Sequence, residues 1–312
     1  SHPVNFTVAR SDLSPALRTL ANTAASGGDI LSHYAFRHLP DGSIEALSSN
    51  GRAYTRVPVK TESVEGTPGS APTPLFTVEA KRLHCLLDAI GGKTVVTFHL
   101  RSGGEVEVET DRGTNLFSSL DPALFPYWDE TLSAAKVTAK VLAGRLHGAY
   151  SHARNFIYDE EAKAPYLCVA EFRGGCLLTT DQMAVSIVKV EGMDGSELRV
   201  HGKDLNNLLH FLSADPASEI EIREGDRASF FLRSDGVVFG ATRPVAVFPK
   251  ITVSWDVKDD YSYEVFREEL AGNIAFLSAG ARWDDSTVRL KPSADGKSLS
   301  MSMQSVGGKP IS

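Results

Sequence analysis

The stretch Ala80-Lys81-Arg82-Leu83-His84-Cys85-Leu86-Leu87 returns later in the chain as Gly202-Lys203-Asp204-Leu205-Asn206-Asn207-Leu208-Leu209. We predict a helix at each copy, over 83–90 in the first. A pair of predicted strands follows in both places, and then a Phe-Pro step, Phe125-Pro126 or Phe248-Pro249. Because order and spacing both recur, the sequence indicates repeated modules with a period of about 123–131 residues.

A second helical pattern opens each module. Apolar residues at positions i, i+4 and i+7 mark one face of a helix. Each set of this kind is followed by a predicted strand and turn, with the strands at 34–39, 166–172 and 288–290. The chain is therefore expected to hold two complete modules and the first half of a third. The three sets are Leu13, Leu17 and Leu20, then Leu142, Leu146 and Ala149, then Leu270, Ile274 and Leu277.

The predicted strands alternate polar and apolar residues, as in the segments 105–109 and 219–223. Such strands have one face in water and the other against a core. A module of two helices and mostly antiparallel strands is an α+β domain whose helices share one side of its sheets. We expect domains at 1–128, 129–254 and 255–312, the last incomplete, and a flexible connection at 66–74 inside the first.

The composition is that of an ordinary globular protein, with 42% hydrophobic and 23% charged residues in a chain of 312. No apolar run approaches the roughly 18 residues of a membrane helix, and the first residues show no secretory signal. The three cysteines lack a C-x-x-C spacing, which favours reduced thiols in the cytoplasm. The net charge is −7, so any contact with DNA requires a local basic face.

These features resemble the β sliding clamp, the processivity subunit of bacterial replicative DNA polymerase, across nearly the whole chain. The resemblance rests on the opening stretch Asn5-Phe6-Thr7-Val8-Ala9-Arg10-Ser11-Asp12-Leu13, the Thr179-Thr180-Asp181 turn and the Phe-Pro steps, all in the family's order. It implies three clamp domains per subunit and two subunits that close a ring, with helices lining the hole and sheets forming the outer wall.

The same resemblance implies the protein's function and its partners. It implies a cytoplasmic accessory protein with no catalytic activity, no cofactor and no metal, which encircles duplex DNA without sequence preference and confers processivity. Its partners would be double-stranded DNA, a DNA polymerase, the clamp loader, other proteins with a clamp-binding motif and a second copy of itself, with no membrane contact.

A DNA-facing set of residues is carried over from the family. Basic residues that line the hole would contact phosphates loosely, although a charged residue on a helix is often only solvated. Tyr166 takes the place of an aromatic that can meet DNA, and a half-buried strand tyrosine is the alternative. The set comprises Lys81 and Arg82 at one helix start, Lys203 at the repeated start, and Arg10, Arg18, Arg145, Arg154 and Tyr166 in or beside other elements.

The second implied site is a hydrophobic pocket for short peptides, where a buried Leu or Phe anchor supplies about 25 cal/mol per Å². The family's Gly-His-Arg-Leu after the Thr-Asp turn is replaced here by Gln182-Met183-Ala184-Val185, which alters the expected partner preference. The alternative is that Met183 and Val185 fill the core of the second domain. The implied pocket residues are Leu167, Thr180, Met183, Ala184, Val185, Pro249 and Val253.

The incomplete third module leaves other functions open. It stops at residue 312 without its second helix, and we expect a chain cut short or an omitted end. The alternative is a divergent relative, encoded by a phage or plasmid, that assembles otherwise. That gap also favours an interaction module that binds peptides without encircling DNA. An enzyme with a dispersed active site is a third hypothesis. Gly91-Gly92-Lys93-Thr94 resembles the end of a phosphate-binding loop, but Leu87 occupies the position of its first glycine, and the predicted helix precedes it instead of following it.

Overall fold

A computed structural model describes residues 4–101, 103–160, 163–250, 264–279 and 287–304. The chain divides into two compact units, Ser1–Lys250 and Ile251–Ser312. Unit 1 holds the first and second predicted modules, and unit 2 holds the described residues that follow them.

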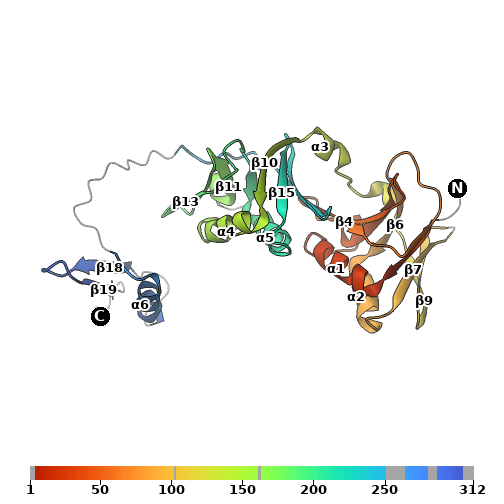
Figure 1. The fold of residues 1–312 in the computed structure, drawn as a ribbon, viewed down its shortest axis with the longest axis horizontal. Helices are drawn as coiled ribbons and strands as arrows, with labels where there is room; N and C mark the ends of the chain where they lie inside the picture. Colours follow the sequence, from red (N-terminus) through yellow and green to blue (C-terminus); the bar gives the residue numbers. More distant parts are fainter. Residues whose placement is uncertain (1–3, 102, 161–162, 251–263, 280–286, 305–312) are drawn as a thin grey trace. The chain divides into compact units, whose positions relative to one another are not determined.

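The first module runs strand, helix, strands, helix, strands, as predicted (Figure 1). Each helix begins directly where a strand ends. Its elements are β1 (Asn5–Ala9), α1 (Arg10–Ala21), β2 (His33–His38), β3 (Ile44–Ser49), β4 (Ala53–Val59), β5 (Ser63–Glu65), β6 (Thr73–Glu79), α2 (Ala80–Ala89), β7 (Val95–Leu100), β8 (Glu105–Thr110) and β9 (Gly113–Ser118).

The second module repeats this order after the short helix α3 (Asp129–Ala134). Its elements are β10 (Lys136–Leu142), α4 (Ala143–Ala153), the 3₁₀ helices η3 (Arg154–Phe156) and η4 (Pro165–Cys168), β11 (Val169–Arg173), β12 (Cys176–Thr180), β13 (Val185–Lys189), β14 (Arg199–His201), the 3₁₀ helix η5 (Gly202–Asp204), α5 (Leu205–Ser213), β15 (Glu219–Glu224), β16 (Ala228–Arg233) and β17 (Val238–Thr242). Unit 2 contains α6 (Arg267–Ala279), β18 (Thr287–Pro292) and β19 (Leu299–Gln304).

One sheet crosses the boundary between the two modules. The sheets have the orders β5-β1-β7-β8-β9, β10-β15-β16-β17-β4-β3-β2-β6, β13-β12-β11-β14 and β18-β19. In the eight-stranded sheet β17 of the second module pairs antiparallel with β4 of the first, in the register Phe239 opposite Thr55. The backbone ladder therefore continues from one module into the next.

The sheet orders also show which strands correspond. β1, β7, β8 and β9 of the first module match β10, β15, β16 and β17 of the second, and β4, β3, β2 and β6 match β13, β12, β11 and β14. The strands that form the junction, β17 and β4, therefore have counterparts in β9 and β13. Both counterparts lie at sheet ends, and in the described part of the chain neither has a strand on its outer side.

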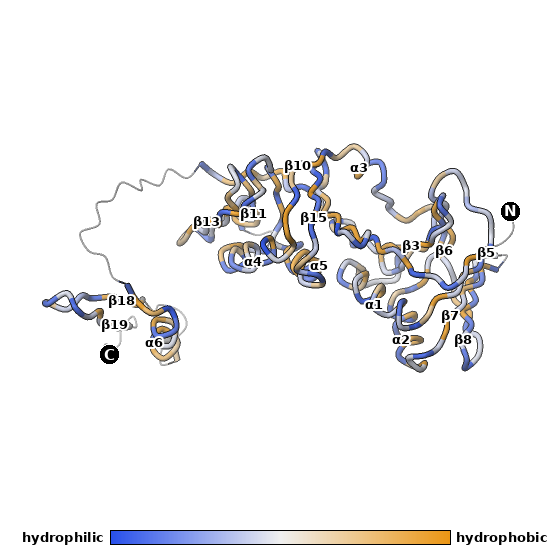
Figure 2. The backbone as a smooth tube through the Cα atoms, viewed as in Figure 1, coloured by the Kyte–Doolittle hydropathy of each residue, from blue (hydrophilic) through white to orange (hydrophobic). Residues whose placement is uncertain are grey.

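The helices of unit 1 lie along one side of its sheets. Figure 1 shows α4, α5, α1 and α2 in one row, with α3 on the opposite side. The expected alternation of the strands is confirmed, since Val106, Val108, Ile220 and Ile222 are fully buried, and blue alternates with orange along β15 in Figure 2. An α+β arrangement with its helices on one side is therefore the observed fold.

Of the predicted helix positions Leu142, Leu146 and Ala149, only Leu142 lies outside the helix. Leu142 is the last residue of β10 and its side chain is 43% exposed. α4 begins at Ala143 and buries Leu146, Ala149 and Tyr150. Leu142 was assigned to the helix because its spacing from Leu146 fits a helical period. It lies in the strand instead, because β10 passes directly into α4 with no loop between them.

Residues 119–135 cross the junction on the outer face of the eight-stranded sheet. The ring of Trp128 stacks on Tyr54 of β4, with centroids 5.3 Å apart, and meets the edge of Phe230 of β16 at 6.1 Å. Leu132 of α3 packs into the cluster that contains Phe230. This segment therefore covers both modules with one continuous apolar contact.

Candidate DNA interface and partner turn

The predicted DNA-facing basic residues lie on or beside the helices α1, α2, α4 and α5, which we call the helical face. Lys81 and Lys203 hold matching places, because β6 and β14 lead into them from equivalent pairings with β2 and β11. Lys203 lies in η5 and not in α5 itself. Six of the basic side chains are exposed, namely Arg18, Lys81, Arg82, Arg145, Arg154 and Lys203, and Arg10 is half-buried.

Arg10, Arg82 and Arg145 make contacts within the protein. The Nε of Arg10 donates to the carbonyl oxygen of Leu87 at 2.7 Å. Arg145 pairs with Glu191 at 2.7 Å, and the guanidinium of Arg82 lies 5.1 Å from the ring centroid of Phe117. These contacts compete with a phosphate for the same groups.

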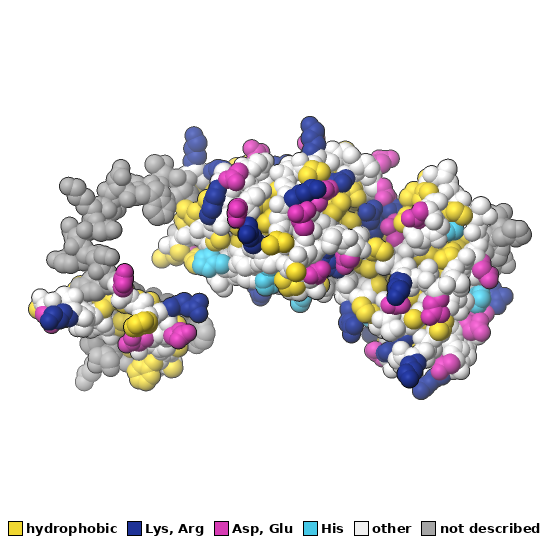
Figure 3. Space-filling view, in the orientation of Figure 1, with side chains coloured by type: hydrophobic (Ala, Val, Ile, Leu, Met, Phe, Trp, Pro, Cys, Tyr) yellow, Lys and Arg dark blue, Asp and Glu magenta, His cyan; other side chains and the backbone are white. Residues whose placement is uncertain are grey.

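Histidines are a component of the helical face that the sequence analysis missed. They are His84 on α2, His147 and His152 on α4, and His210 on α5. Figure 3 shows histidine side chains gathered over α4 and α5. Burial lowers the pKa of His84, which Asp88 opposes, and its Nε2 lies 2.7 Å from the hydroxyl of Tyr34. Their place among the polar residues of three predicted helices was the available signal.

A tight turn joins β12 to β13 at residues 180–184, which we call the partner turn. The hydroxyl of Thr180 accepts from the backbone N–H of Gln182 at 3.1 Å and donates to the carbonyl oxygen of Ala184 at 2.7 Å. The carboxylate of Asp181 accepts from the backbone N–H groups of Met183 and Ala184 at 2.9 and 2.7 Å. Side chains thus fix the turn from both ends.

The first module has the same turn at residues 49–53, which we call the twin turn. The hydroxyl of Ser49 accepts from the backbone N–H of Gly51 and donates to the carbonyl oxygen of Ala53. The side-chain oxygen of Asn50 accepts from the backbone N–H groups of Arg52 and Ala53, and all four distances are 2.7–3.1 Å. Gly51 has a φ of +84°. In the partner turn the matching residue is Gln182, with a φ of +77°.

The two turns differ in what covers them. In the first module the turn lies at the junction, where Arg52 pairs with the buried Asp204 at 3.0 Å. In the second module Met183 takes the place of Arg52, and its side chain is 92% exposed. Val185 is 40% exposed, so the alternative that Met183 and Val185 fill the domain core is wrong.

The remaining predicted pocket residues divide into buried and exposed positions. Leu167 and Thr180 are buried, Ala184 is half-buried and Pro249 is exposed. Val253 lies outside the described residues. Tyr166 was expected in a strand and lies instead in η4, where Pro165 begins the 3₁₀ turn. Its hydroxyl accepts a hydrogen bond from Nε2 of Gln182 at 3.3 Å.

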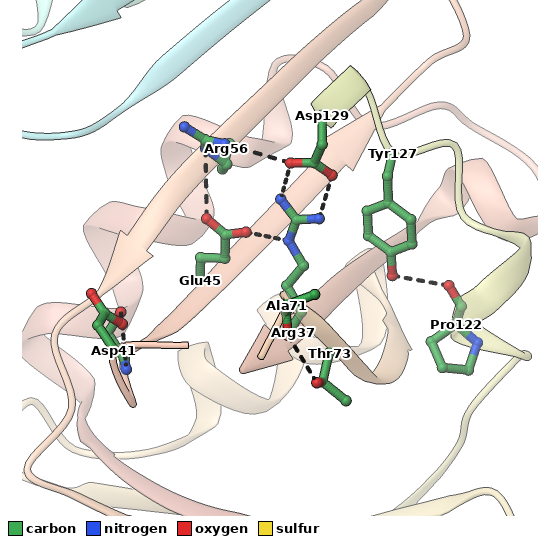
Figure 4. Close-up of polar contacts among 10 residues, drawn as sticks. Arg37, Asp41, Glu45, Arg56, Ala71, Thr73, Pro122, Tyr127 and Asp129 are labelled. Carbon is green, nitrogen blue, oxygen red and sulfur yellow. Dashed lines mark hydrogen bonds and ion pairs between the residues drawn. The ribbon is translucent and has the colours of Figure 1, made fainter. Parts of the chain in front are cut away.

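A charge cluster holds the junction segment against the first module (Figure 4). The buried Arg37 of β2 donates to both carboxylate oxygens of Asp129, at 2.5 and 2.7 Å, and also pairs with Glu45. Arg56 of β4 lies 3.6 Å from Glu45 and 3.8 Å from Asp129. Burial raises the pKa of Glu45. For Asp129 burial acts in the same direction, but the hydrogen bonds from Arg37 outweigh it, and its pKa is lowered.

Among the residues that the structure describes, no group of three or more His, Cys, Asp or Glu side chains is arranged to hold a metal ion. None of the described helices has the length and apolar content needed to cross a membrane.

Solved structures of bacterial β clamps share this fold. The chain is similar to the DNA polymerase III subunit β from Pseudomonas aeruginosa, with 16% identity, a TM-score of 0.79, and 98% of this chain and 82% of that chain covered. It is also similar to the DNA polymerase sliding clamp from Bacillus subtilis, with 15% identity, a TM-score of 0.76 and coverage of 100% and 83%.

A third structure contains a bound peptide. It is the Helicobacter pylori β clamp bound to DNA ligase peptide, with 12% identity, a TM-score of 0.69, and 96% of this chain and 83% of that chain covered. No protein-family model and no curated protein matches the sequence. The chain thus has the α+β clamp fold, at low sequence identity to the clamps of known structure.

Proposed function

We propose that this protein is a DNA sliding clamp, which encircles duplex DNA in the cytoplasm and tethers a polymerase and other partners without catalysing a reaction. The observation that carries the proposal is the junction between β17 and β4, together with its open counterparts β9 and β13. A contact between two different edges of a repeated module is heterologous, and such contacts generate closed rings when the rotation closes.

Each open edge is a natural acceptor for another copy of the module. An edge strand presents unpaired N–H and C=O groups that favour pairing with a further strand. On β9 the side chain of Leu116 is 51% exposed, and β13 exposes Val185 and Ile187. Repetition of the β17–β4 contact at these edges would bury the apolar side chains and extend the ladder. We therefore propose a ring-forming homo-oligomer, with two subunits as the expected number.

The helical face is the proposed DNA-contacting surface. Clustered Lys and Arg side chains bind phosphates irrespective of sequence, which is the contact that a sliding protein requires. Lys81, Arg82 and Lys203 lie exposed on this side, while the chain as a whole carries a net charge of −7. Acidic groups elsewhere would keep the outer surface from binding the same duplex.

The partner turn is the proposed docking site for peptides of the polymerase, the clamp loader and other proteins. Its Met183, which lies in the turn and not in the edge strand β13, is 92% exposed and offers an apolar surface beside polar backbone groups, and a flexible methionine adapts to varied partners. The structurally similar Helicobacter pylori clamp, which is bound to a DNA ligase peptide, supports a role of this kind.

The mass in solution tests the ring. By light scattering we expect a mass of about twice 33.7 kDa. Leu116→Lys places a charge on the open edge β9 and should yield the single-chain mass. Leu124→Lys is the matched control, because Leu124 is 70% exposed and lies outside β9. A wild-type chain that remains a monomer at all concentrations, or two variants of equal mass, would refute ring closure through β9.

A further inference from the structure

Gln182 is the one residue other than glycine with a positive φ in the described part of the chain. An L-residue with a side chain is strained in this region, and such strain is kept where the surrounding structure supports it. The twin turn makes the same hydrogen bonds with Gly51 at the matching position. Closure of the turn therefore does not require a glutamine at this position.

The side chain of Gln182 contacts a different element. Its Nε2 donates to the hydroxyl of Tyr166 at 3.3 Å, which connects the partner turn to η4. Tyr166 directly precedes the buried Leu167, whereas Met183, next to Gln182, is 92% exposed. The bridge thus ties Tyr166 to the turn that carries Met183, an exposed apolar side chain.

The bridge also retains free hydrogen-bonding groups. Because the hydroxyl of Tyr166 accepts from Gln182, its own proton remains available as a donor. The side-chain carbonyl of Gln182 remains available as an acceptor. A donor and an acceptor next to an apolar anchor site match the N–H and C=O groups of an extended peptide.

We propose that Gln182 and Tyr166 form one specificity element of the peptide-docking surface, with Gln182 positioning Tyr166 against the partner turn. The inference rests on the proposed docking function of this surface. The occupant is an extended partner peptide, which places an apolar side chain against Met183 and its backbone on the polar pair. The strain at Gln182 is retained because Gly at this position would remove the bridge.

Four variants of the full chain separate the bridge from the strain. Gln182→Ala removes the bridge and keeps the strained backbone, Tyr166→Phe removes only the hydroxyl, and Gln182→Gly removes both bridge and strain. The fourth variant combines Gln182→Ala with Tyr166→Phe. The probe is the tightest peptide selected on the wild-type chain from a displayed library of random ten-residue peptides, with affinity measured by calorimetry.

We expect each single variant to weaken the peptide by about threefold to tenfold, the range of one hydrogen bond. The double variant should be no weaker than either single one, because both remove the same bridge. Gln182→Gly should melt at a higher temperature than wild type and still bind more weakly, a combination that a merely structural role would not give. Met183→Asp should abolish binding and so place the peptide on this surface.

Three results would overturn the inference, and they are distinguishable. Equal affinity for wild type, Gln182→Gly and Tyr166→Phe removes the specificity element but leaves peptide docking intact. Peptides that are insensitive to Met183→Asp bind elsewhere on the chain, which removes both the element and the proposed docking site. If no peptide is selected from the library, both the specificity element and the proposed docking site are refuted. The mass in solution still tests the ring independently.

Discussion

Thr242, at the end of β17, donates both its backbone N–H and its hydroxyl to the carbonyl oxygen of Arg52, at 2.8 and 2.6 Å. The side chain of Arg52 in turn pairs with the buried Asp204 of the second module. The end of the β17–β4 ladder is therefore held by polar contacts at the twin turn. In the second module the matching turn carries the exposed Met183, which is the difference expected between an occupied and an open edge.

Gly240 tests the packing of the junction. A Cβ at this position would lie 2.9 Å from Phe230 and 3.3 Å from Trp128, and both rings are held in the packed layer over β17. Gly240→Ala should therefore destabilise the protein by about 1–3 kcal/mol, as expected for overpacking. Gly148→Ala is the control, since a Cβ there meets nothing within 4 Å, and it should stabilise α4 by up to about 1 kcal/mol. Equal unfolding midpoints in urea would contradict the proposed packing.

The partner turn and the twin turn predict opposite changes in stability when a glycine is introduced in one and removed from the other. Gln182→Gly should raise the free energy of unfolding by about 1 kcal/mol, because a positive φ strains any residue with a Cβ. Gly51→Ala should lower it by a similar amount, although the new Cβ would meet only Leu31 at an ordinary 3.7 Å. Thermal and urea unfolding measure both effects. Changes of the same sign would show that the two turns are not equivalent.

Asp129 gives the junction a pH dependence. Its pKa in the folded protein is lowered by Arg37 against the effect of burial, so its stabilising contribution is complete above the unfolded value of about 3.9 and is lost as the pH falls through the folded value. Asp129→Asn should lower the free energy of unfolding by about 1–2 kcal/mol at neutral pH. The expected loss is modest because the carboxylate of Asp129 is partly exposed and solvent screens its charge. The difference from wild type should shrink below about pH 4.

Glu45 changes the stability of the protein with pH in the opposite direction to Asp129. Because burial raises the pKa of Glu45, ionisation of Glu45 destabilises the folded protein as the pH rises. Glu45 is present in both wild type and Asp129→Asn, so the comparison of the two proteins isolates the effect of Asp129. Urea unfolding from pH 3 to 7 measures the difference between the two proteins. A constant difference across this range would mean that the pair with Arg37 does not stabilise the folded state.

The helical face should determine the salt dependence of DNA binding. Replacement of Lys81, Arg82 and Lys203 by Ala should weaken binding at every DNA sequence and reduce the slope of log K against log salt by up to about 0.9 for each phosphate that is no longer neutralised. The control replaces Lys60, Lys136 and Lys140, which are exposed and lie off the helices, and removes the same charge. Equal slopes for the two triple variants would exclude this surface as the DNA interface.

Local pattern predicted much of the module but not its boundaries. Lys81 and Lys203 were matched correctly because a stretch of eight residues recurs with the same spacing. Leu142 was placed in a helix because its spacing from Leu146 fits a helical period, and nothing in the sequence marks the direct step from β10 to α4. Tyr166 was placed in a strand although Pro165 favours a turn at that point.

The junction and the strained turn were beyond sequence reasoning. Pairing of β17 with β4 joins Phe239 to Thr55, and no local period specifies a partner at such a separation. The positive φ of Gln182 had one available signal, the glycine at the matching place in the twin turn. Charge counting found the cations of the helical face but not that Arg10, Arg82 and Arg145 already contact other groups.

Topological retention on DNA tests the central claim most directly. The chain is loaded on nicked circular plasmid by its partner clamp loader, separated from free protein in high salt, and measured again after one restriction cut. We predict that it stays on the circle in salt that disrupts phosphate contacts and leaves as soon as the DNA has ends. Equal retention on circular and linear DNA, or loss from both in high salt, would contradict an encircling clamp and favour a peptide-binding module that does not surround DNA.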